Sequence, residues 1–422
     1  MTMLDQRAEV FNRMVLDDAL DEYGLIRHQL TYPERGPITD DQLAYAREDR
    51  EWRRRQGLKW HPLQGTPAYA MYEDANYVGN RYLVAMVWRW LAEQNEAARQ
   101  AAEIGYQATI YPYVEGAKRE RGYWPKPYGA LQGEYAVDKV YPETSLDQAY
   151  SPVIALWRYA QHVATDAEKM VIGEALQAHG HWWIRHHYSY DYLGEVWKAF
   201  GDRIGSPSAL KLPIGMHIAY QMTGDTQLRD EAVRIVRQAK ADGALRMHRG
   251  PRGEIKELYH WAEIYDYFMR DTDLTDEADW SRLIQECWRT AKSSIQPDGL
   301  CIGQGFFRDD GLLEPYTPGP VDDVHHGYWK TDARHPASTA QMACLAMLVQ
   351  ELGYDPDAGA VGRRLLEAVR EEHTGTIRGY VYTRPEQMPP AFRDNPPPPL
   401  FATRTVVFWL DAYWRGRMLG VL

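Results

Sequence analysis

Apolar residues recur along the chain at the spacing of helices that bury one face. The clearest case is residues 208–243, where Leu210, Ile214 and Ile218 form a stripe that ends at Thr223-Gly224-Asp225. Side chains three and four positions apart share one face of a helix, and a second stripe resumes directly after the glycine-containing turn. This segment therefore predicts a helical hairpin.

The same order of helix, short turn and helix recurs in four other segments, 75–104, 147–188, 256–294 and 335–372. Two end helices, near 5–23 and 403–420, have no neighbour in sequence, and pairing them would close a ring of six hairpins. We expect an all-α fold, an (α/α)6 toroid or six-hairpin barrel, with a seventh hairpin as the alternative. No linker-like composition divides the chain, so residues 1–422 are expected to form a single toroid domain.

Long inserts rich in Gly, Pro, Trp and Tyr separate the hairpins. These are residues 105–146, 189–206, 242–256, 295–334 and 373–402. Repeats of an open solenoid have nearly constant length, whereas these hairpins are unevenly spaced. Because long loops in a compact domain usually carry function, we expect the inserts to converge on one mouth of the ring.

The composition is that of a globular protein, 45% hydrophobic and 25% charged, with a formal net charge of −11. Basic runs such as Arg53-Arg54-Arg55 are short, which argues against a nucleic-acid partner. The first residues lack an apolar signal-peptide core, and no run approaches the ~18 apolar residues of a membrane helix. We expect a cytoplasmic protein with no membrane partner, and the sequence leaves a homo-oligomer open.

The aromatic composition favours a ligand-binding cleft, since the chain has 15 Trp and 29 Tyr but only 8 Phe. Tyr and Trp are favoured where a ring must be apolar on one side and hydrogen-bond on the other, as on a sugar-binding wall. A Trp- and Tyr-rich core is the alternative. The loop RGYWPKPYGALQGEY supplies Trp124 and Tyr128 as candidate substrate platforms.

Three segments resemble the six-hairpin glycosidase superfamily, particularly the unsaturated glucuronyl hydrolases and related glucuronidase-type families. They are TSLDQAYSPVIALWRYAQHVATDAEK, SPSALKLPIGMHIAYQMTGDTQLRDEA and HPASTAQMACLAMLVQELG. The resemblance implies a helical toroid acting on uronic-acid-containing oligosaccharides, with an Asp at the start of an inner helix as proton donor. Asp147 stands at the matching position, although the family commonly has two adjacent acids where this chain has Leu146-Asp147-Gln148.

Asp147 is also the candidate acid/base on its own surroundings. Partial burial beside Tyr150 and Trp157 would raise the pKa of its carboxyl toward the working pH, as proton donation requires. The alternative is that Ser145 or Asp147 only caps the helix. Gln148, the next residue, is a candidate substrate contact.

A second group of candidates lies on the helix ELYHWAEIYDYF. Tyr259 and Glu263 share one face of this helix, and His260 lies at its edge. His260 and Glu263 could act as base and partner, with Tyr259 as a substrate contact, or His260 could be a satisfied structural residue. Before the 75–104 hairpin, Tyr72, Asp74 and Asn76 are weaker candidates.

The densest group of ionisable residues is VDDVHHGYWKTDARHPAST, which precedes an apolar helix. Such a loop indicates function. We expect Asp332 to act as a catalytic carboxylate and the others to bind substrate, rings by stacking and Arg334 by a bidentate contact to a carboxylate. The candidate binding residues here are His325, His326, Tyr328, Trp329, Arg334 and His335.

No metal or cofactor is expected. Adjacent histidines diverge in regular structure and no HExxH spacing occurs, while Cys287, Cys301 and Cys344 have no CxxC spacing and read as reduced core residues. Nucleotide-binding glycine motifs and a GxSxG elbow are also absent from the sequence.

The sequence favours a glycoside hydrolase that cleaves an acidic oligosaccharide substrate. Asp147 would serve as acid/base, and Asp332 or Glu263 as the second carboxylate that hydrolysis of a saturated glycoside requires. Three alternatives stay open: a uronate lyase that uses Tyr and His for β-elimination, a sugar epimerase, and a noncatalytic carbohydrate-binding protein.

Overall fold

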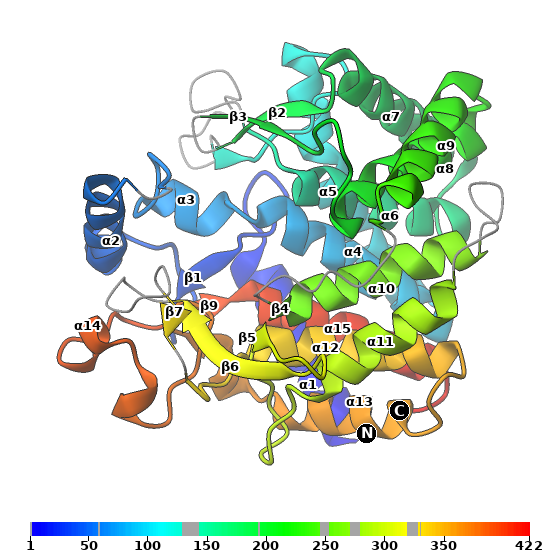
Figure 1. Cartoon of the computed structure of the whole chain (residues 1–422). Helices are drawn as coiled ribbons and strands as arrows, with labels where there is room; N and C mark the ends of the chain where they lie inside the picture. Colours follow the sequence, from blue (N-terminus) through cyan, green and yellow to red (C-terminus); the bar gives the residue numbers. More distant parts are fainter. Residues whose placement is uncertain are drawn as a thin grey trace.

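The computed structural model describes residues 2–57, 60–128, 143–192, 195–244, 253–270, 279–318, 328–329 and 331–422. Six helices form an inner ring in which each contacts the next and the last contacts the first (Figure 1). They are α4 (Ala75–Glu93), α6 (Leu146–His162), α8 (Lys211–Thr223), α10 (Ile255–Arg270), α12 (Pro336–Glu351) and α15 (Thr403–Met418).

Six outer helices cover this ring, one for each inner helix. They are α5 (Glu96–Arg119), α7 (Asp166–Arg185), α9 (Thr226–Ala241), α11 (Trp280–Lys292), α13 (Ala358–Ala368) and α1 (Met3–Arg13). Five follow their inner partner along the chain, whereas α1 packs on α15. The predicted (α/α)6 toroid is confirmed, and the described residues form six hairpins.

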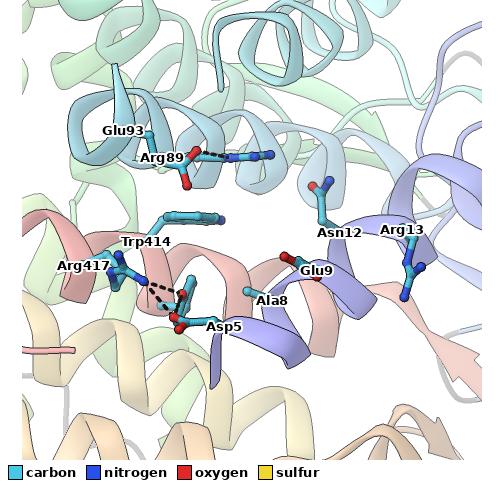
Figure 2. A pocket seen from close by; sticks show the side chains of 10 residues that line it. Asp5, Ala8, Glu9, Asn12, Arg13, Arg89, Glu93, Trp414 and Arg417 are labelled. Atoms are coloured by element: carbon cyan, nitrogen blue, oxygen red, sulfur yellow. Dashed lines mark hydrogen bonds and ion pairs between the residues drawn. The ribbon is translucent and has the colours of Figure 1, made fainter. Parts of the chain in front are cut away.

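The two chain ends close the ring, as the unpaired end helices predicted. Asp5 of α1 accepts hydrogen bonds of 2.7 Å from both Tyr413 and Arg417 of α15. On its other side α1 meets α4, where Tyr82 donates to Asn12 at 2.9 Å. Figure 2 shows the groove of about 350 Å³ that remains between these three helices.

Hydrophobic patterning decides which helix is inner and which is outer. Helix α4 buries every residue from Ala75 to Trp88, whereas α9 buries only one stripe, from Leu228 to Ala239. A helix that is covered all round needs apolar residues all round, while an outer helix keeps a polar face for water. At the turn between α8 and α9, Gly224 ends one helix with a φ of 77° and Asp225 caps the next.

The inserts form small sheets rather than purely irregular loops. One sheet has the order β1 (Gln29–Thr31), β9 (Leu400–Ala402), β8 (Gly375–Thr376), and another pairs β2 (Ser189–Tyr192) with β3 (Glu195–Lys198). The largest has the order β4 (Gly253–Glu254), β5 (Gln304–Phe307), β6 (Leu313–Pro318), β7 (Tyr328–Trp329), all antiparallel. Strand β4 runs directly into α10 and β9 into α15, so the sheets lie where inner helices begin.

Short elements complete the described chain. They are α2 (Ala44–Arg55), α3 (Pro67–Tyr72), α14 (Pro390–Arg393) and single turns at Met14–Ala19, Asp41–Leu43, Pro207–Leu210, Glu371–Thr374 and Pro385–Gln387. The predicted insert at 105–146 was wrong in its first part, because α5 continues to Arg119 and tolerates Pro112 inside it. Among the described helices, none combines the length and the apolar character needed to cross a lipid bilayer.

Candidate active site

The first turns of the inner helices meet at one end of the ring. Asp147 at the start of α6 contacts Lys211 at the start of α8 and, at 2.9 Å, Lys256 at the start of α10. Gln148 donates at 3.2 Å to Asp74, which directly precedes α4. Helix N-termini carry partial positive charge, so this mouth favours negatively charged groups.

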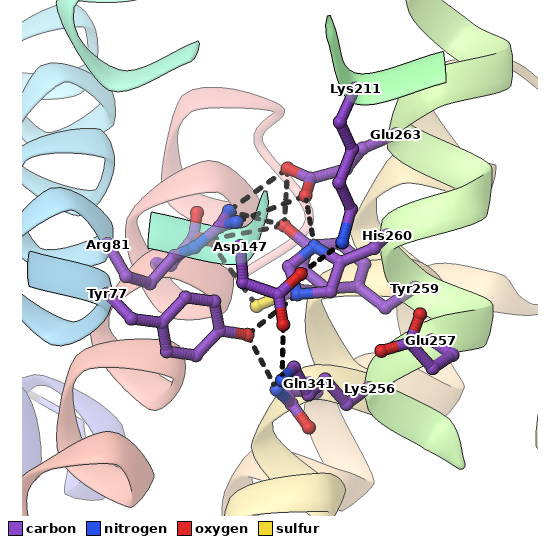
Figure 3. A network of polar contacts seen from close by, with 12 residues as sticks. Tyr77, Arg81, Asp147, Lys211, Lys256, Glu257, Tyr259, His260, Glu263 and Gln341 are labelled. Atoms are coloured by element: carbon purple, nitrogen blue, oxygen red, sulfur yellow. Dashed lines mark hydrogen bonds and ion pairs between the residues drawn. The ribbon is translucent and has the colours of Figure 1, made fainter. Parts of the chain in front are cut away.

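Asp147 is an ionised carboxylate between two ammonium groups (Figure 3). Burial would raise the pKa of its carboxyl, but Lys211 and Lys256 outweigh burial and hold that pKa well below its usual range. The predicted upward shift was therefore wrong in sign. As it stands in the structure, Asp147 can accept a proton or stabilise positive charge, and it has no proton to donate.

Two further acids, Glu73 and Asp74, lie near Asp147, because Gln148 and Lys256 also interact with Asp74. Burial and then the charge of Asp74 raise the pKa of Glu73 to about 7, in spite of contacts with Lys126 and, at 3.4 Å, Tyr192. Burial would raise the pKa of Asp74, but His28, Lys256 and further cations outweigh burial and lower that pKa to about 2. Glu73 was not among the predicted site residues, and the signal that could have found it is the pair of acids directly before an inner helix.

His260 contacts a polar group at each ring nitrogen. Its Nε2 shares a hydrogen bond of 2.8 Å with Tyr77 Oη, which also accepts from the side-chain amide of Gln341 at 3.2 Å. The other ring nitrogen, Nδ1, lies 3.4 Å from Glu263. Burial lowers the pKa of His260, so its imidazole is neutral near pH 7.

Below this layer, Arg81 joins three inner helices. Its guanidinium donates to both carboxylate oxygens of Glu263 at 3.0 Å, to Asp411 at 3.0 Å and to Tyr259 at 2.7 Å. Tyr259 in turn donates to Glu263 at 2.9 Å. Burial would raise the pKa of Glu263, but Arg81 outweighs burial and keeps that pKa well below its usual value. The predicted residues Tyr259 and Glu263 thus lie in the packed layer that supports His260.

One further cation faces the mouth. Arg404, in the first turn of α15, lies over the Tyr77 ring with 5.3 Å between its guanidinium carbon and the ring centroid. Within the described part of the chain Arg404 forms no ion pair, and its buried Nε has no hydrogen-bond partner. A guanidinium without a carboxylate is suited to bind one from a ligand.

The predicted residues of the 331–335 segment have partners outside this network. Asp332 accepts from Arg384 at 2.9 Å and from Gln387 at 2.8 Å. Arg334 donates to Asp298 at 2.7 Å. His335 caps α12, since its Nδ1 accepts from the backbone of Ser338 at 3.1 Å, and burial lowers its pKa to about 3.

The predicted aromatic platforms are mostly buried. Trp124 has no exposed surface and packs against Tyr113 and His179, and Tyr128 is 1% exposed and stacks on Tyr69. No face of either ring is open to a sugar in this structure. Tyr328 and Trp329 form strand β7 beside β6, and His325 and His326 lie outside the described residues.

The described residues include one group with metal-ligand geometry. Donor atoms of His28, Glu73 and Asp74 lie within 4.8 Å of one another. Lys126 contacts Glu73, and Lys256 acts electrostatically on Asp74, so cations already neutralise this group. The space that Tyr77, Asp147 and His260 border is only about 10 Å³, roughly room for one water molecule.

Comparisons with known proteins support the fold. No protein-family model and no curated protein matches the chain. Among solved structures, it is similar to a sugar epimerase from a ruminal bacterium, at 11% identity and a TM-score of 0.52 over 97% of this chain and 98% of that one. Cellobiose 2-epimerase from Bacillus thermoamylovorans matches at 11% identity and a TM-score of 0.50, over 80% and 86%. At this identity the likeness shows the fold alone, an (α/α)6 toroid like the one the sequence predicted.

Proposed function

We propose that this protein is a carbohydrate-active enzyme, a glycoside hydrolase that cleaves oligosaccharides containing a uronic acid. One observation carries the proposal: two carboxyl groups at the mouth have pKa values shifted in opposite directions, Glu73 up to about 7 and Asp147 well below its usual range. Two carboxyls with opposite protonation states are the requirement of acid/base glycoside hydrolysis. Asp74, whose pKa is lowered to about 2, is a third carboxylate beside Glu73.

In this scheme Glu73 is the general acid. Its proton passes to the glycosidic oxygen as the bond from that oxygen to the anomeric carbon breaks. Water forms the new bond to the anomeric carbon, and its proton passes to the Asp147 carboxylate. Burial and the negative charge of Asp74 raise the pKa of Glu73 to about 7, so a large share of Glu73 keeps its proton near neutral pH. Lys211 and Lys256 hold Asp147 in place.

The charge of the mouth supports an acidic substrate. Lys211 and Lys256 share one carboxylate, Asp147, and Arg404 forms no ion pair within the described residues. The mouth therefore has positive charge to spare, and the positive ends of the inner helices add to it. A uronic-acid carboxylate at this mouth would pair with the Arg404 guanidinium.

Sugar epimerisation is the second candidate, because the neutral imidazole of His260 favours it. An uncharged histidine can remove a proton from a carbon next to a sugar carbonyl, and a second acidic group must then supply a proton on the other face. The two solved structures compared above are named as a cellobiose 2-epimerase and a sugar epimerase. In this candidate Glu73 would have no essential role.

A substrate screen separates these functions. Saturated and unsaturated uronic-acid oligosaccharides and neutral disaccharides are each incubated with the protein, and the products are followed by mass and by ultraviolet absorbance. Hydrolysis adds the mass of one water across the products. Epimerisation leaves the mass unchanged, and β-elimination creates a conjugated double bond that absorbs. We expect the first result with an acidic oligosaccharide, and no turnover of any sugar would contradict the proposal.

A further inference from the structure

A second and larger cavity opens at the opposite end of the ring. It measures about 550 Å³ and lies on the ring axis, because every inner helix contributes a residue from its last turns. These residues include Trp88, Arg158, Gln221, Tyr267, Glu351 and Met418. A cavity of this size holds a small organic molecule.

This axial cavity is separate from the mouth. Between them lies the ion pair of Arg81 and Glu263, and Glu263 borders the axial cavity while Arg81 borders the small space below Asp147. Tyr150 borders both spaces. A molecule in the axial cavity would therefore be one layer of side chains away from His260.

Most charges around the axial cavity are already paired. Arg270 donates to Asp266 at 2.7 Å and to Glu351 at 2.8 Å, and Arg415 donates to Glu351 at 2.7 Å. Glu263 is paired with Arg81. Each of these acids has at least one arginine partner, so none is left free for a cationic ligand.

Arg158 is the exception. Its guanidinium lies 4.7 Å from the centroid of the Trp88 ring, and within the described residues it forms no ion pair. The buried Nε of Arg158, Nε1 of Trp88 and Oη of Tyr150 also lack hydrogen-bond partners there. Buried hydrogen-bond donors normally have an acceptor. A group of donors without one, next to a guanidinium that forms no ion pair, favours binding of a ligand that supplies acceptor oxygens.

We propose that the axial cavity is a second binding site, for a small hydroxylated carboxylic acid of the sugar-acid type. The carboxylate pairs with Arg158, and the body of the molecule packs on Trp157 and Tyr267, with Gln161 and Gln221 as hydrogen-bonding partners. Aromatic side chains next to amides form the kind of wall that sugars prefer. This inference does not depend on the reaction at the mouth.

The test is isothermal titration of the full chain with sodium D-glucuronate, using variants that separate the two ends. Arg158→Gln removes the axial charge, Arg404→Gln removes the charge at the mouth, and Arg237→Gln on the outer helix α9 is the matched control. We expect a binding event that weakens at least tenfold in Arg158→Gln and persists in Arg404→Gln and Arg237→Gln. D-glucose, which lacks the carboxylate, should not produce this event.

Two further measurements keep the result interpretable. Circular dichroism shows whether Arg158→Gln is folded, and if it is not, Arg158→Lys keeps the charge but loses the planar fork and should still bind more weakly. Glucuronate binding that is unchanged in the Arg158 variants, or lost only in Arg404→Gln, would overturn the proposal. Oligosaccharide turnover by Arg158→Gln is measured in parallel, so failure at one end is not mistaken for failure at the other.

Discussion

Lys256 Nζ lies 2.9 Å from the Asp147 carboxylate, although 109 positions separate the two residues in the chain. Asp147 begins α6 and Lys256 begins α10, and Lys211 at the start of α8 binds the same carboxylate. Three inner helices therefore converge on one side chain. The toroid creates this site by bringing the first turns of its inner helices to one mouth.

Replacing Glu73 by Gln should lower the turnover of an acidic oligosaccharide by a factor of roughly 10² to 10⁴, the usual contribution of a general acid. In the wild type, turnover should fall as the pH rises through about 7, because Glu73 then loses the proton it must donate. The pH dependence of kcat checks this. Glu93→Gln, at the far end of α4, the inner helix that follows Glu73, is the control and should keep wild-type turnover.

The raised pKa of Glu73 also predicts how the stability of the fold depends on pH. The folded pKa of Glu73, about 7, exceeds its ordinary value of 4.5, so folding binds a proton between these pH values. Stability attributable to Glu73 is therefore full below pH 4.5 and declines as the pH rises toward 7. Chemical denaturation across this range should show a smaller decline in Glu73→Gln than in the wild type, and identical slopes would contradict the shifted pKa.

Asp147→Asn should lose turnover and also weaken the fold at neutral pH. The substitution leaves Lys211, which is 2% exposed, without its anionic partner, and loss of a hydrogen bond to a charged group costs about 1.5–3 kcal/mol. Because the folded pKa of Asp147 is depressed, its contribution is present above its unfolded pKa and is lost as pH falls. The difference between Asp147→Asn and wild type in denaturant unfolding should thus shrink in acid.

Arg404→Gln should raise KM for an acidic oligosaccharide about tenfold to a hundredfold, because a charge-assisted contact to the substrate carboxylate is lost. The KM of a neutral analogue should change little. Steady-state kinetics with matched acidic and neutral substrates measure the difference. An equal change for both substrates would mean that Arg404 does not recognise the acid.

Arg81→Met should reduce the free energy of unfolding by roughly 3–5 kcal/mol, because Glu263 and Asp411 would remain buried without their cation. Denaturant titration measures this loss. Arg99→Met removes an exposed ion pair with Glu96 and serves as the control, with no measurable change expected.

His335 offers a way to separate capping from substrate binding. Asparagine is a good N-cap, so His335→Asn should keep both stability and turnover, whereas His335→Ala should lose about 1 kcal/mol of stability. If His335 binds the sugar directly, as the sequence suggested, His335→Asn would instead raise KM while leaving stability intact. Thermal unfolding and kinetics of the two variants distinguish these roles.

The fold could be predicted from the sequence because each helical hairpin is specified by residues that are close together in the chain. Each hairpin shows its own apolar stripes and turn, and the two amphipathic end helices, near 5–23 and 403–420, had no neighbour except each other. The strands in the inserts were not predicted, since segments such as Tyr328–Trp329 are too short to show a period of two. Pairing between distant segments is what defines them.

The site could be predicted only in part, because it depends on contacts between residues that are far apart in the chain. Asp147 and His260 were named from their local surroundings, and the structure brings both into one network (Figure 3). Lys211 and Lys256 were not named, because a single lysine near a helix start is unremarkable until the ring sets it beside a carboxylate. Their distance in sequence also explains why the expected direction of the Asp147 pKa was wrong.

The most direct test of the proposed chemistry is the rate of reducing-end release from a uronic-acid oligosaccharide at pH 6 by wild type, Glu73→Gln and Asp147→Asn, each verified as folded. We predict release by the wild type and a loss of at least a hundredfold in both variants. Release at the wild-type rate by both variants would contradict the assignment of these two carboxyl groups as the catalytic pair.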